Sequence, residues 1–310
     1  MTDLILAIPS KGRLKEQSEA FFQSSGFKLS QKGGDRGYEA RLDGLENVQV
    51  LLLSAREIAQ GLIDGAFHVG ITGEDLLHDL SERPGEDARV IKPLGFGFAD
   101  AVVAVPNAWL DVSKMADLEA AAALFRERHG RRMKVATKYM RLTRRFFAAN
   151  SVGEYRLVYS GGATEAAPAS GAADLIVDIT TSGATLKANG LKVIDDGVIL
   201  KSQACLTGSL FADWTDQAQA ALRGLLGPVE ARSAAVDLTL LGPAKPLPAK
   251  LVDTLGLSQY GPASVTCPSA RATEIAQMLT EQGYGPVSVQ QPDFIFTEHL
   301  TLFEKFFSKV

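Results

Sequence analysis

Short apolar runs alternate with amphipathic stretches along the first 180 residues of the chain. Runs of strand-favouring residues stand at 4–8, 48–53, 68–72, 89–96, 100–106, 134–137 and 175–179. Stretches with a helical period lie between them at 14–24, 55–65 and 115–129. Strands that are apolar throughout are typical of a sheet that is covered on both faces. The alternation therefore predicts an α/β fold with mainly parallel sheets.

The pattern changes at two places, and each change predicts a boundary. Three small or flexible residues stand close together in 94–100, LGFGFAD, just before a new apolar run, which predicts a hinge between two lobes. An alanine-rich helix is predicted over 215–226, and Pro228 is expected to stop it. A separate domain is then expected to follow.

The last part of the chain, residues 228–310, has a rhythm of its own. Its expected strands lie at 231–243, 261–268 and 285–296, and its expected helices at 245–257 and 269–283. This βαβαβ order predicts a small α+β domain.

Composition limits the classes of function. With 310 residues, 46% hydrophobic and 22% charged, the chain has room for two or three ordinary globular domains. A formal net charge of −4 argues against a broad nucleic-acid surface, although a local basic pocket could hold a small polyanion. We therefore expect no nucleic-acid partner.

The sequence predicts neither export nor membrane insertion. The apolar run Leu4–Ile8 is short and follows an acid, and no window approaches the roughly 20 apolar residues of a membrane span. Cys205 and Cys267 have no CxxC partner and are expected to be small buried hydrophobic side chains. The four histidines share no metal-ligand spacing. These features predict a cytoplasmic protein without metal-thiolate or histidine metal sites.

One segment, DLIVDITTSGAT at 174–185, combines a buried strand with a run of hydroxyls. Asp178 is expected at the carboxyl edge of the strand, where open α/β sheets bind ligands. The residues after it can form a tight turn with inward-facing hydroxyls and N–H groups, before a helix that begins near Leu186. This predicts a phosphate-binding loop made by Thr181, Ser182, Gly183, Ala184 and Thr185. The alternative is a simple helix cap made by the same hydroxyls.

The acid and the loop resemble the segment by which phosphoribosyltransferases hold the 5′-phosphate of phosphoribosyl pyrophosphate. The commonest pattern there has two adjacent acids, whereas here Ile179 follows Asp178. Four longer stretches in the first 225 residues resemble ATP phosphoribosyltransferase, the first enzyme of histidine biosynthesis. They are LAIPSKGRL (6–14), HVGITGEDLL (68–77), KVATKYMRLTRRFF (134–147) and the segment 160–195.

The resemblance implies a fold and a domain organisation. It implies a two-lobed catalytic core like that of periplasmic binding proteins, with the active site in a cleft. Lobe I would comprise 1–95 with a return segment at about 190–225, and lobe II would comprise 96–189 and carry the loop. Residues 228–310 would be a ferredoxin-like α+β domain with a regulatory or assembly role, as in the long form of the family.

The resemblance also implies the reaction and its partners. The phosphoribosyl group would pass from phosphoribosyl pyrophosphate to N1 of ATP, and pyrophosphate would leave. Mg²⁺ would arrive on the substrate phosphates and need few protein ligands. L-histidine would be an inhibitor, and the chain would form a homo-oligomer, either a dimer or a hexamer.

The charged residues of the loop region are assigned roles on this basis. Asp178 and Glu165 would face the ribose, while Lys11, Arg13 and Lys138 would draw charge from the leaving pyrophosphate. Lys11 and Arg13 follow the first strand, and their alternative is a solvated basic turn. Glu165 could instead favour a helix N-terminus through its charge.

Three further residues are candidates for substrate contact. Gly73 would let the backbone approach a ligand, and Asp75 would reach a ribose hydroxyl or a metal, or else cap the helix that begins there. Arg56 corresponds to an arginine that the family follows with Asp-Ile-Pro, where this chain has Glu57, Ile58 and Ala59.

Other classes of function fit parts of the same pattern. A solute-binding module would use two lobes and a hinge to capture an anion without chemistry. A LysR-type effector domain or an inert regulatory subunit would also have two lobes. A phosphoribosyltransferase with another acceptor base would share the loop.

Overall fold

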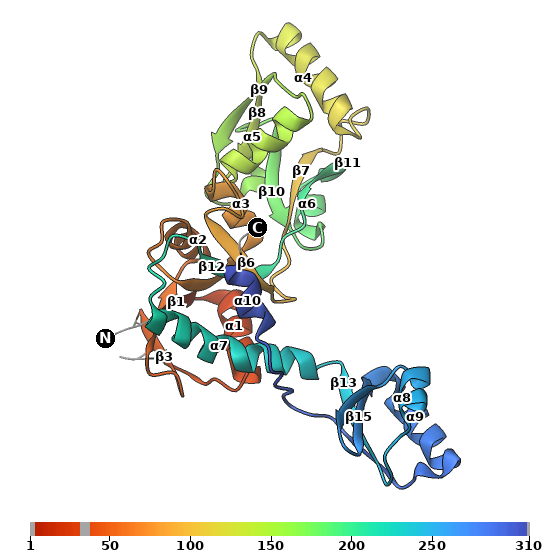
Figure 1. The fold of residues 1–310 in the computed structure, drawn as a ribbon. Helices are drawn as coiled ribbons and strands as arrows, with labels where there is room; N and C mark the ends of the chain where they lie inside the picture. The colour runs from red at the N-terminus through yellow and green to blue at the C-terminus, as the bar shows by residue number, and fades with distance from the viewer. Residues whose placement is uncertain (1–3, 32–37, 309–310) are drawn as a thin grey trace. The chain divides into compact units, whose positions relative to one another are not determined.

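The computed structural model describes residues 4–31 and 38–308, which form three separate sheets (Figure 1). The chain divides into two compact units. One comprises Met1–Phe21 and Leu29–Ala218, and the other comprises Phe22–Lys28 and Gln219–Val310. The first unit contains two of the sheets, and we call each of these sheets with its helices a lobe.

Lobe I is built on a seven-stranded sheet in the order β2-β3-β4-β1-β5-β12-β6. Its centre is parallel, because β1 pairs in parallel with both β4 and β5, and β12 then pairs antiparallel with β5 and β6. The strands are β1 (Leu4–Pro9), β2 (Leu29–Gln31), β3 (Glu39–Leu42), β4 (Val48–Leu53), β5 (Val69–Gly73), β6 (Ala88–Pro93) and β12 (Ala204–Ser209). The helices are α1 (Gly12–Ser24), α2 (Ala55–Ile63) and α3 (Glu74–Leu80).

Lobe II is built on a five-stranded sheet in the order β11-β7-β10-β8-β9. The strands are β7 (Asp100–Pro106), β8 (Met133–Thr137), β9 (Tyr155–Tyr159), β10 (Leu175–Thr180) and β11 (Leu191–Leu200). The helices are α4 (Met115–His129), α5 (Met140–Ala149), the short 3₁₀ turn η1 (Thr164–Ala166) and α6 (Ala184–Ala188). Apolar side chains of β7, β8 and β10 pack with α4 and α5 into one core. Burial on both faces explains why these strands read as continuous apolar runs.

The chain crosses between the lobes twice. The first crossing, residues 94–99, lies where the sequence predicts a hinge, and the second, residues 201–203, returns the chain to lobe I. The return is shorter than the expected segment of about 190–225. Residues Leu191–Leu200 form β11, which pairs antiparallel with β7 and extends the lobe II sheet. The next strand, β12, pairs with β5 and belongs to the lobe I sheet.

The sequence predicts the long apolar strands well and the short or partly polar strands poorly. All seven predicted strands of the first 180 residues occur, with shifts of a few residues at their ends. The strands β2, β3, β9, β11 and β12 were not predicted, because they are short, partly polar or interrupted. The predicted stop at Pro228 is wrong: α7 (Asp216–Ala235) continues through it. Leu225, Leu226 and Val229 near this proline are fully buried, and the packing of such residues stabilises the helix despite the lost N–H bond.

The third sheet belongs to the second unit and has the order β14-β15-β13-β16, with every neighbouring pair antiparallel. Its elements are β13 (Leu238–Pro243), α8 (Ala249–Leu255), β14 (Ser258–Gly261), β15 (Ser264–Pro268), α9 (Ala272–Leu279) and β16 (Val287–Gln290). This βαββαβ order is ferredoxin-like. A final helix, α10 (Thr301–Phe307), is capped by Glu230 of α7, whose carboxylate accepts the N–H groups of Thr301 and Leu302 at 3.0 and 2.9 Å.

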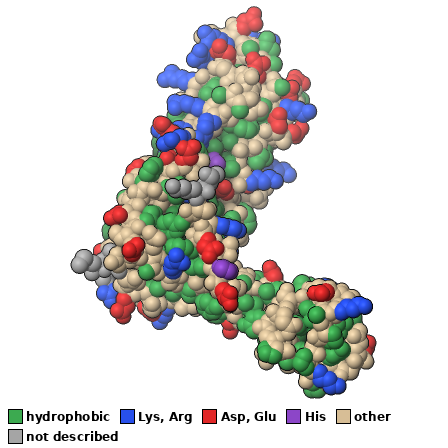
Figure 2. Space-filling view, viewed as in Figure 1, with side chains coloured by type: hydrophobic (Ala, Val, Ile, Leu, Met, Phe, Trp, Pro, Cys, Tyr) green, Lys and Arg blue, Asp and Glu red, His purple; other side chains and the backbone are tan. Residues whose placement is uncertain are grey.

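Both cysteines are free and buried, as predicted. Burial raises the pKa of the Cys205 thiol to about 12, which makes it unreactive at neutral pH. His68 is structural: its Nδ1 accepts the Ile5 N–H at 3.0 Å, and its Nε2 lies 3.0 Å from the Asp213 carbonyl oxygen. Within residues 4–31 and 38–308, no helix has an apolar run long enough to cross a membrane. On the face drawn in Figure 2, acidic and basic side chains are interspersed.

Candidate active site

Three segments that are far apart in the chain meet at the carboxyl edge of the lobe II sheet. The strands β8, β9 and β10 run parallel, so the residues that follow them lie at one edge. Lys138 follows β8, the segment 160–165 follows β9, and Asp178 lies two residues before the end of β10. The topology therefore brings the sequence-predicted residues of lobe II together.

A pocket of about 270 Å³ opens at this edge. Its lining residues are Ala99, Glu165, Asp178, Ile179, Thr180, Thr181, Ser182, Thr185 and Leu186. Gly183 and Ala184 belong to the same turn. The hydroxyl-rich bend thus borders open space instead of being filled by packed side chains.

Asp178 is half-buried beside the pocket, after three fully buried residues of β10. Burial raises the pKa of its carboxyl above the ordinary value, and the charge of Glu165 adds to this effect. The Ile179 N–H, which donates to Asp178 Oδ1 at 2.8 Å, and the charge of Lys138 oppose it. A carboxyl held in a costly charged state next to a cavity is a candidate for ligand contact.

The loop after β10 is shaped by its own hydroxyls. Thr180 Oγ1 accepts the Gly183 N–H at 2.8 Å, which closes a turn with Gly183 in the left-handed region at φ +71°. Thr181 Oγ1 donates to the Phe98 carbonyl at 2.9 Å, and this bond ties the loop to the first crossing between the lobes. The helix α6 begins at Ala184, two residues before the expected start near Leu186.

Glu165 reaches the pocket from a strained turn. Ala163, two residues earlier, has φ +48° and ψ +39°, a left-handed conformation that is uncommon for a residue with a side chain. The buried Thr164 between them donates to Ser160 Oγ at 3.0 Å, which holds the turn in place. Backbone strain of this kind is often kept at functional sites.

Lys138 and Asp178 are electrostatic neighbours. The charge of Lys138 lowers the pKa of Asp178, and its Nζ lies 5.1 Å from the centroid of the Tyr139 ring. The strands that precede the two residues, β8 and β10, are adjacent in the sheet. The position of Lys138 is therefore set by the lobe II sheet itself.

Lys11 and Arg13 are exposed at the carboxyl end of β1 in lobe I, on either side of Gly12, which has φ +70°. Both are described by the structure, and neither lines the pocket beside Asp178. Lys11 is near Glu57, where its charge adds to a lowering of the carboxyl pKa that comes mainly from the Ser54 hydroxyl. The two cations are thus presented by the other lobe.

Gly73 and Asp75 lie at the start of α3. A Cβ at Gly73 would come within 2.3 Å of Asp75 Oδ1, so a side chain there would collide with the carboxylate. Asp75 is only 5% exposed; its Oδ1 accepts the Ser202 hydroxyl at 2.8 Å, and its N–H donates to Ser202 Oγ at 3.0 Å. Neither predicted role of Asp75 is seen here: α3 has Gly73 at its N-cap and no side-chain cap hydrogen bond, and the Asp75 carboxylate is held by Ser202 instead.

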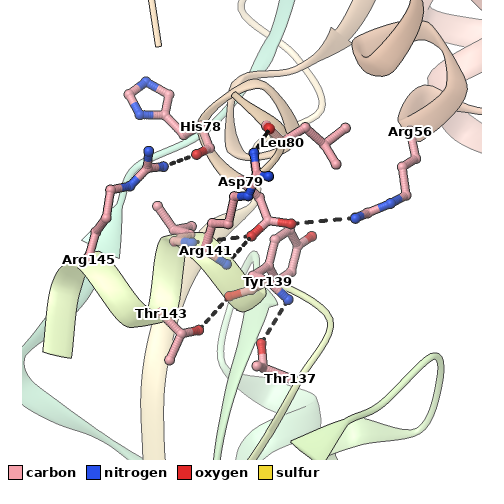
Figure 3. Close-up of polar contacts among 10 residues, drawn as sticks. Arg56, His78, Asp79, Leu80, Thr137, Tyr139, Arg141, Thr143 and Arg145 are labelled. Carbon is pink, nitrogen blue, oxygen red and sulfur yellow. Dashed lines mark hydrogen bonds and ion pairs between the residues drawn. The ribbon is translucent and has the colours of Figure 1, made fainter. Parts of the chain in front are cut away.

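Arg56 lies near the start of α2 and points toward Asp79, with Nη1 and Oδ2 3.6 Å apart (Figure 3). The helix begins with a capping box in which Ser54 Oγ accepts the Glu57 N–H at 3.3 Å and Glu57 accepts the Ser54 N–H at 2.9 Å. The S-x-x-E spacing could have predicted this start from the sequence. Arg56, Asp79 and Arg141 border a second pocket of about 290 Å³.

Sequence reasoning missed several residues that shape the site. Thr180, directly before the predicted loop, closes the turn, and its position right after the predicted strand 175–179 was a usable signal. Ser202 and Asp79 gave no local signal, since their partners are 127 and about 60 residues away in the chain.

Comparisons with known proteins identify the family of the chain. A family model described as ATP phosphoribosyltransferase matches residues 54–226. An ATP phosphoribosyltransferase of Caulobacter vibrioides is 48% identical over 98% of this chain and 97% of its own length. One of Bradyrhizobium diazoefficiens is 47% identical over 97% of this chain and 96% of its own length.

A solved structure shares the fold of the core. The ATP phosphoribosyl transferase (HisG:HisZ) complex from Thermotoga maritima superposes with a TM-score of 0.57 at 21% identity, over 73% of this chain and 96% of that one. The family match covers more than half of the sequence, and the curated relatives cover almost all of it. The chain belongs to the ATP phosphoribosyltransferase family.

Proposed function

We propose that the lobe II pocket binds the phosphoribosyl group while this enzyme transfers it to N1 of ATP in the first step of histidine biosynthesis. The observation that carries the assignment is the convergence of Asp178, Glu165 and the 181–185 loop on one pocket. A solute-binding module, an inert regulatory subunit or an effector domain would not account for the full-length likeness to transferases.

Different residues are proposed to contact different parts of phosphoribosyl pyrophosphate. The hydroxyls and N–H groups of the 181–185 loop suit a 5′-phosphate, and Asp178 and Glu165 suit the ribose hydroxyls. The transition state resembles an oxocarbenium ion, so the carboxylate of Asp178 also lies where positive charge develops. Lys11 and Arg13 from lobe I, with Lys138, balance the charge of the leaving pyrophosphate. No general base is required, because N1 of adenine is already nucleophilic.

Mg²⁺ is proposed as the cofactor. Glu165, Asp178 and the loop hydroxyls offer oxygen atoms, the donor type that Mg²⁺ prefers, while in the described residues no group of three or more His, Cys, Asp and Glu could hold a metal. This donor set fits an ion that arrives on phosphates and keeps most of its waters. When bound, Mg²⁺ would neutralise part of the negative charge of the pyrophosphate.

The assay for this function follows the N1-ribosylated product by its near-ultraviolet absorbance. We expect the product and pyrophosphate to appear only when ATP, phosphoribosyl pyrophosphate and Mg²⁺ are all present. Adenine and orotate serve as alternative acceptors in parallel reactions. Product formation with either of them instead of ATP would assign the chain a different acceptor base.

Below neutral pH, kcat/KM is expected to fall as Asp178 becomes protonated. The apparent pKa of this acidic limb should lie above the usual pKa of an aspartate. Asp178 has to be ionised to accept ribose hydroxyls, and burial raises its pKa, so it protonates at a higher pH than an exposed aspartate. A pH profile of kcat/KM measures the limb, and circular dichroism at each pH confirms that the protein stays folded. A profile that is flat down to the ordinary aspartate pKa would contradict the role.

The ferredoxin-like domain is proposed to bind L-histidine as an inhibitor and to support a homo-oligomer, a dimer or a hexamer. The support is the presence of a complete βαββαβ domain beyond the catalytic core. We expect L-histidine to lower the initial rate, and a variant truncated before β13 to lose this response. An unchanged rate at millimolar L-histidine would contradict the regulatory role. The proposed compartment is the cytoplasm, with which two free buried cysteines agree.

A further inference from the structure

A buried acid outside the pocket, Asp79 of α3, makes contacts that the proposed chemistry does not use. Its side chain is 3% exposed. A carboxylate is costly to bury unless its oxygens accept hydrogen bonds or face a cation. The partners of Asp79 come from lobe II and from α2.

The main partners are the first N–H groups of α5. Arg141 N and Leu142 N donate to Asp79 Oδ1 at 3.0 and 3.2 Å, and Arg56 lies 3.6 Å from Oδ2 (Figure 3). The residue at the N-cap position of α5, Tyr139, makes no side-chain cap hydrogen bond. A helix leaves its first N–H groups without partners inside the helix. Asp79 of lobe I therefore serves as the side-chain N-cap of α5, a helix of lobe II.

Two arginines of lobe II donate hydrogen bonds to backbone carbonyls of lobe I. Arg141 Nη1 donates to the Leu80 carbonyl at 2.6 Å, and Arg145 donates to the carbonyls of Ser81, at 3.2 Å, and His78. These carbonyls lie at the C-terminal end of α3, where cations are favoured. Side chains at the C-terminal end of α3 and at the start of α5 thus supply hydrogen-bond partners for each other's free backbone groups.

Asp75, one turn earlier on α3, extends this contact. Its carboxylate accepts the Ser202 hydroxyl at 2.8 Å, and Ser202 lies in the second crossing between the lobes. Tyr139, at the start of α5, is 1% exposed, and burial raises the pKa of its hydroxyl, which also donates to Asp75. One face of α3 thus holds both a crossing and the start of α5.

We propose that Asp79 is a positioning residue that fixes the lobe II pocket relative to Lys11 and Arg13 of lobe I. The inference rests on the proposed function, in which transfer needs groups from both lobes. The pocket is lined by lobe II residues and Ala99, so phosphoribosyl pyrophosphate can bind without the α3–α5 contact. Transfer to ATP cannot proceed at the normal rate without it.

The test is the Asp79→Ala variant of the full chain. We expect kcat to fall about 10- to 100-fold, because small displacements of reacting groups have effects of this size. The dissociation constant for phosphoribosyl pyrophosphate with Mg²⁺, measured by calorimetry without ATP, is expected to stay unchanged. Asp79→Asn should recover most of kcat, since its amide oxygen still accepts the helix N–H groups.

A matched control is Glu82→Gln. Glu82 is 80% exposed and faces Arg141 at 3.4 Å, so this variant removes a charge from the same region and leaves the cap intact. Its kcat should equal that of the wild type. If Asp79→Ala does not fold, Arg145→Met removes the bonds of one exposed arginine to the Ser81 and His78 carbonyls and should lower kcat at unchanged affinity.

Two results would overturn the proposal. One is a wild-type kcat in the folded Asp79→Ala variant, or in Arg145→Met where the alanine variant does not fold. The other is a loss of affinity for phosphoribosyl pyrophosphate equal to the loss of kcat, since it would mean that Asp79 only supports the pocket. A wild-type enzyme without transferase activity would instead reject the proposed function.

Discussion

Asp178→Asn is expected to lower kcat by about 100- to 1,000-fold, the range for loss of one charge-stabilising group in a transition state. The amide has nearly the shape of the carboxylate and can still accept the Ile179 N–H. It cannot supply a negative charge beside the forming oxocarbenium ion. Binding of phosphoribosyl pyrophosphate should weaken less than kcat falls, because the charge matters most in the transition state.

The same substitution is expected to leave the unfolding temperature unchanged or to raise it slightly. Folding raises the pKa of Asp178, mainly through burial, so its contribution to stability is present below its unfolded pKa and is lost as the pH rises through its folded pKa. At neutral pH the ionised side chain therefore opposes folding, and a neutral amide removes that opposition. A loss of activity without a loss of stability would identify Asp178 as a functional group.

Asp174→Asn, just before the same strand, is the matched control. Although burial opposes ionisation of Asp174, the bonds from Arg131 at 2.7 and 3.0 Å and from the Lys134 N–H at 2.7 Å lower its pKa. Its stabilising contribution is therefore present above its unfolded pKa, and Asp174→Asn should lower the melting temperature at neutral pH with little change in kcat. Steady-state kinetics and thermal unfolding of both variants separate the two roles; a wild-type kcat in Asp178→Asn would reject its catalytic assignment.

The lobe II part of the site was largely predictable from the sequence because its signals are local. The apolar run Leu175–Val177 fixes a strand, and an acid followed by hydroxyls and one glycine fixes a turn at its end. Parallel pairing then places Lys138 and the 160–165 segment at the same edge. Each step needs only neighbouring residues and the geometry of a parallel sheet.

The contacts between the lobes could not be predicted in this way. Asp79 caps a helix that begins about 60 residues later, and Thr181 donates to a carbonyl 83 residues earlier. An acid on a short helix and a threonine in a loop look the same in the sequence whether or not such partners exist. The strand β11 was missed for a related reason: its burial follows no alternating pattern, and its pairing with β7 is interrupted by register shifts.

The two lobes therefore differ in what they contribute. Lobe II supplies every lining residue of the pocket except Ala99 of the first crossing, and lobe I carries Lys11, Arg13 and Asp79. Positioning two polyanionic substrates is the main demand of this reaction, which needs little covalent work from side chains. In the proposed function, the buried acids of α3 would supply position, whereas Asp178, the half-buried acid of β10, would supply charge.

Gly183→Val is expected to raise KM for phosphoribosyl pyrophosphate about 10- to 100-fold, the equivalent of one hydrogen bond to a charged group. Gly183 has φ +71°, where a β-branched residue is strongly disfavoured, although no atom stands within 4 Å of the position of a Cβ. The backbone must therefore shift to relieve strain, and this shift moves N–H groups that the proposed function directs at the 5′-phosphate. Because the substitution changes the conformation of the loop, adding phosphate or ATP should not restore the binding of phosphoribosyl pyrophosphate.

Gly130→Val separates this effect from general strain. Gly130 ends α4 at φ +64°, again with nothing within 4 Å of a Cβ, and it lies outside the pocket. Both variants should lose about 1–2 kcal/mol of stability, the cost of a left-handed conformation for a residue with a side chain. Only Gly183→Val should change KM for phosphoribosyl pyrophosphate. Equal KM values in the two variants and the wild type would mean that the backbone of the 181–185 loop does not hold the phosphate.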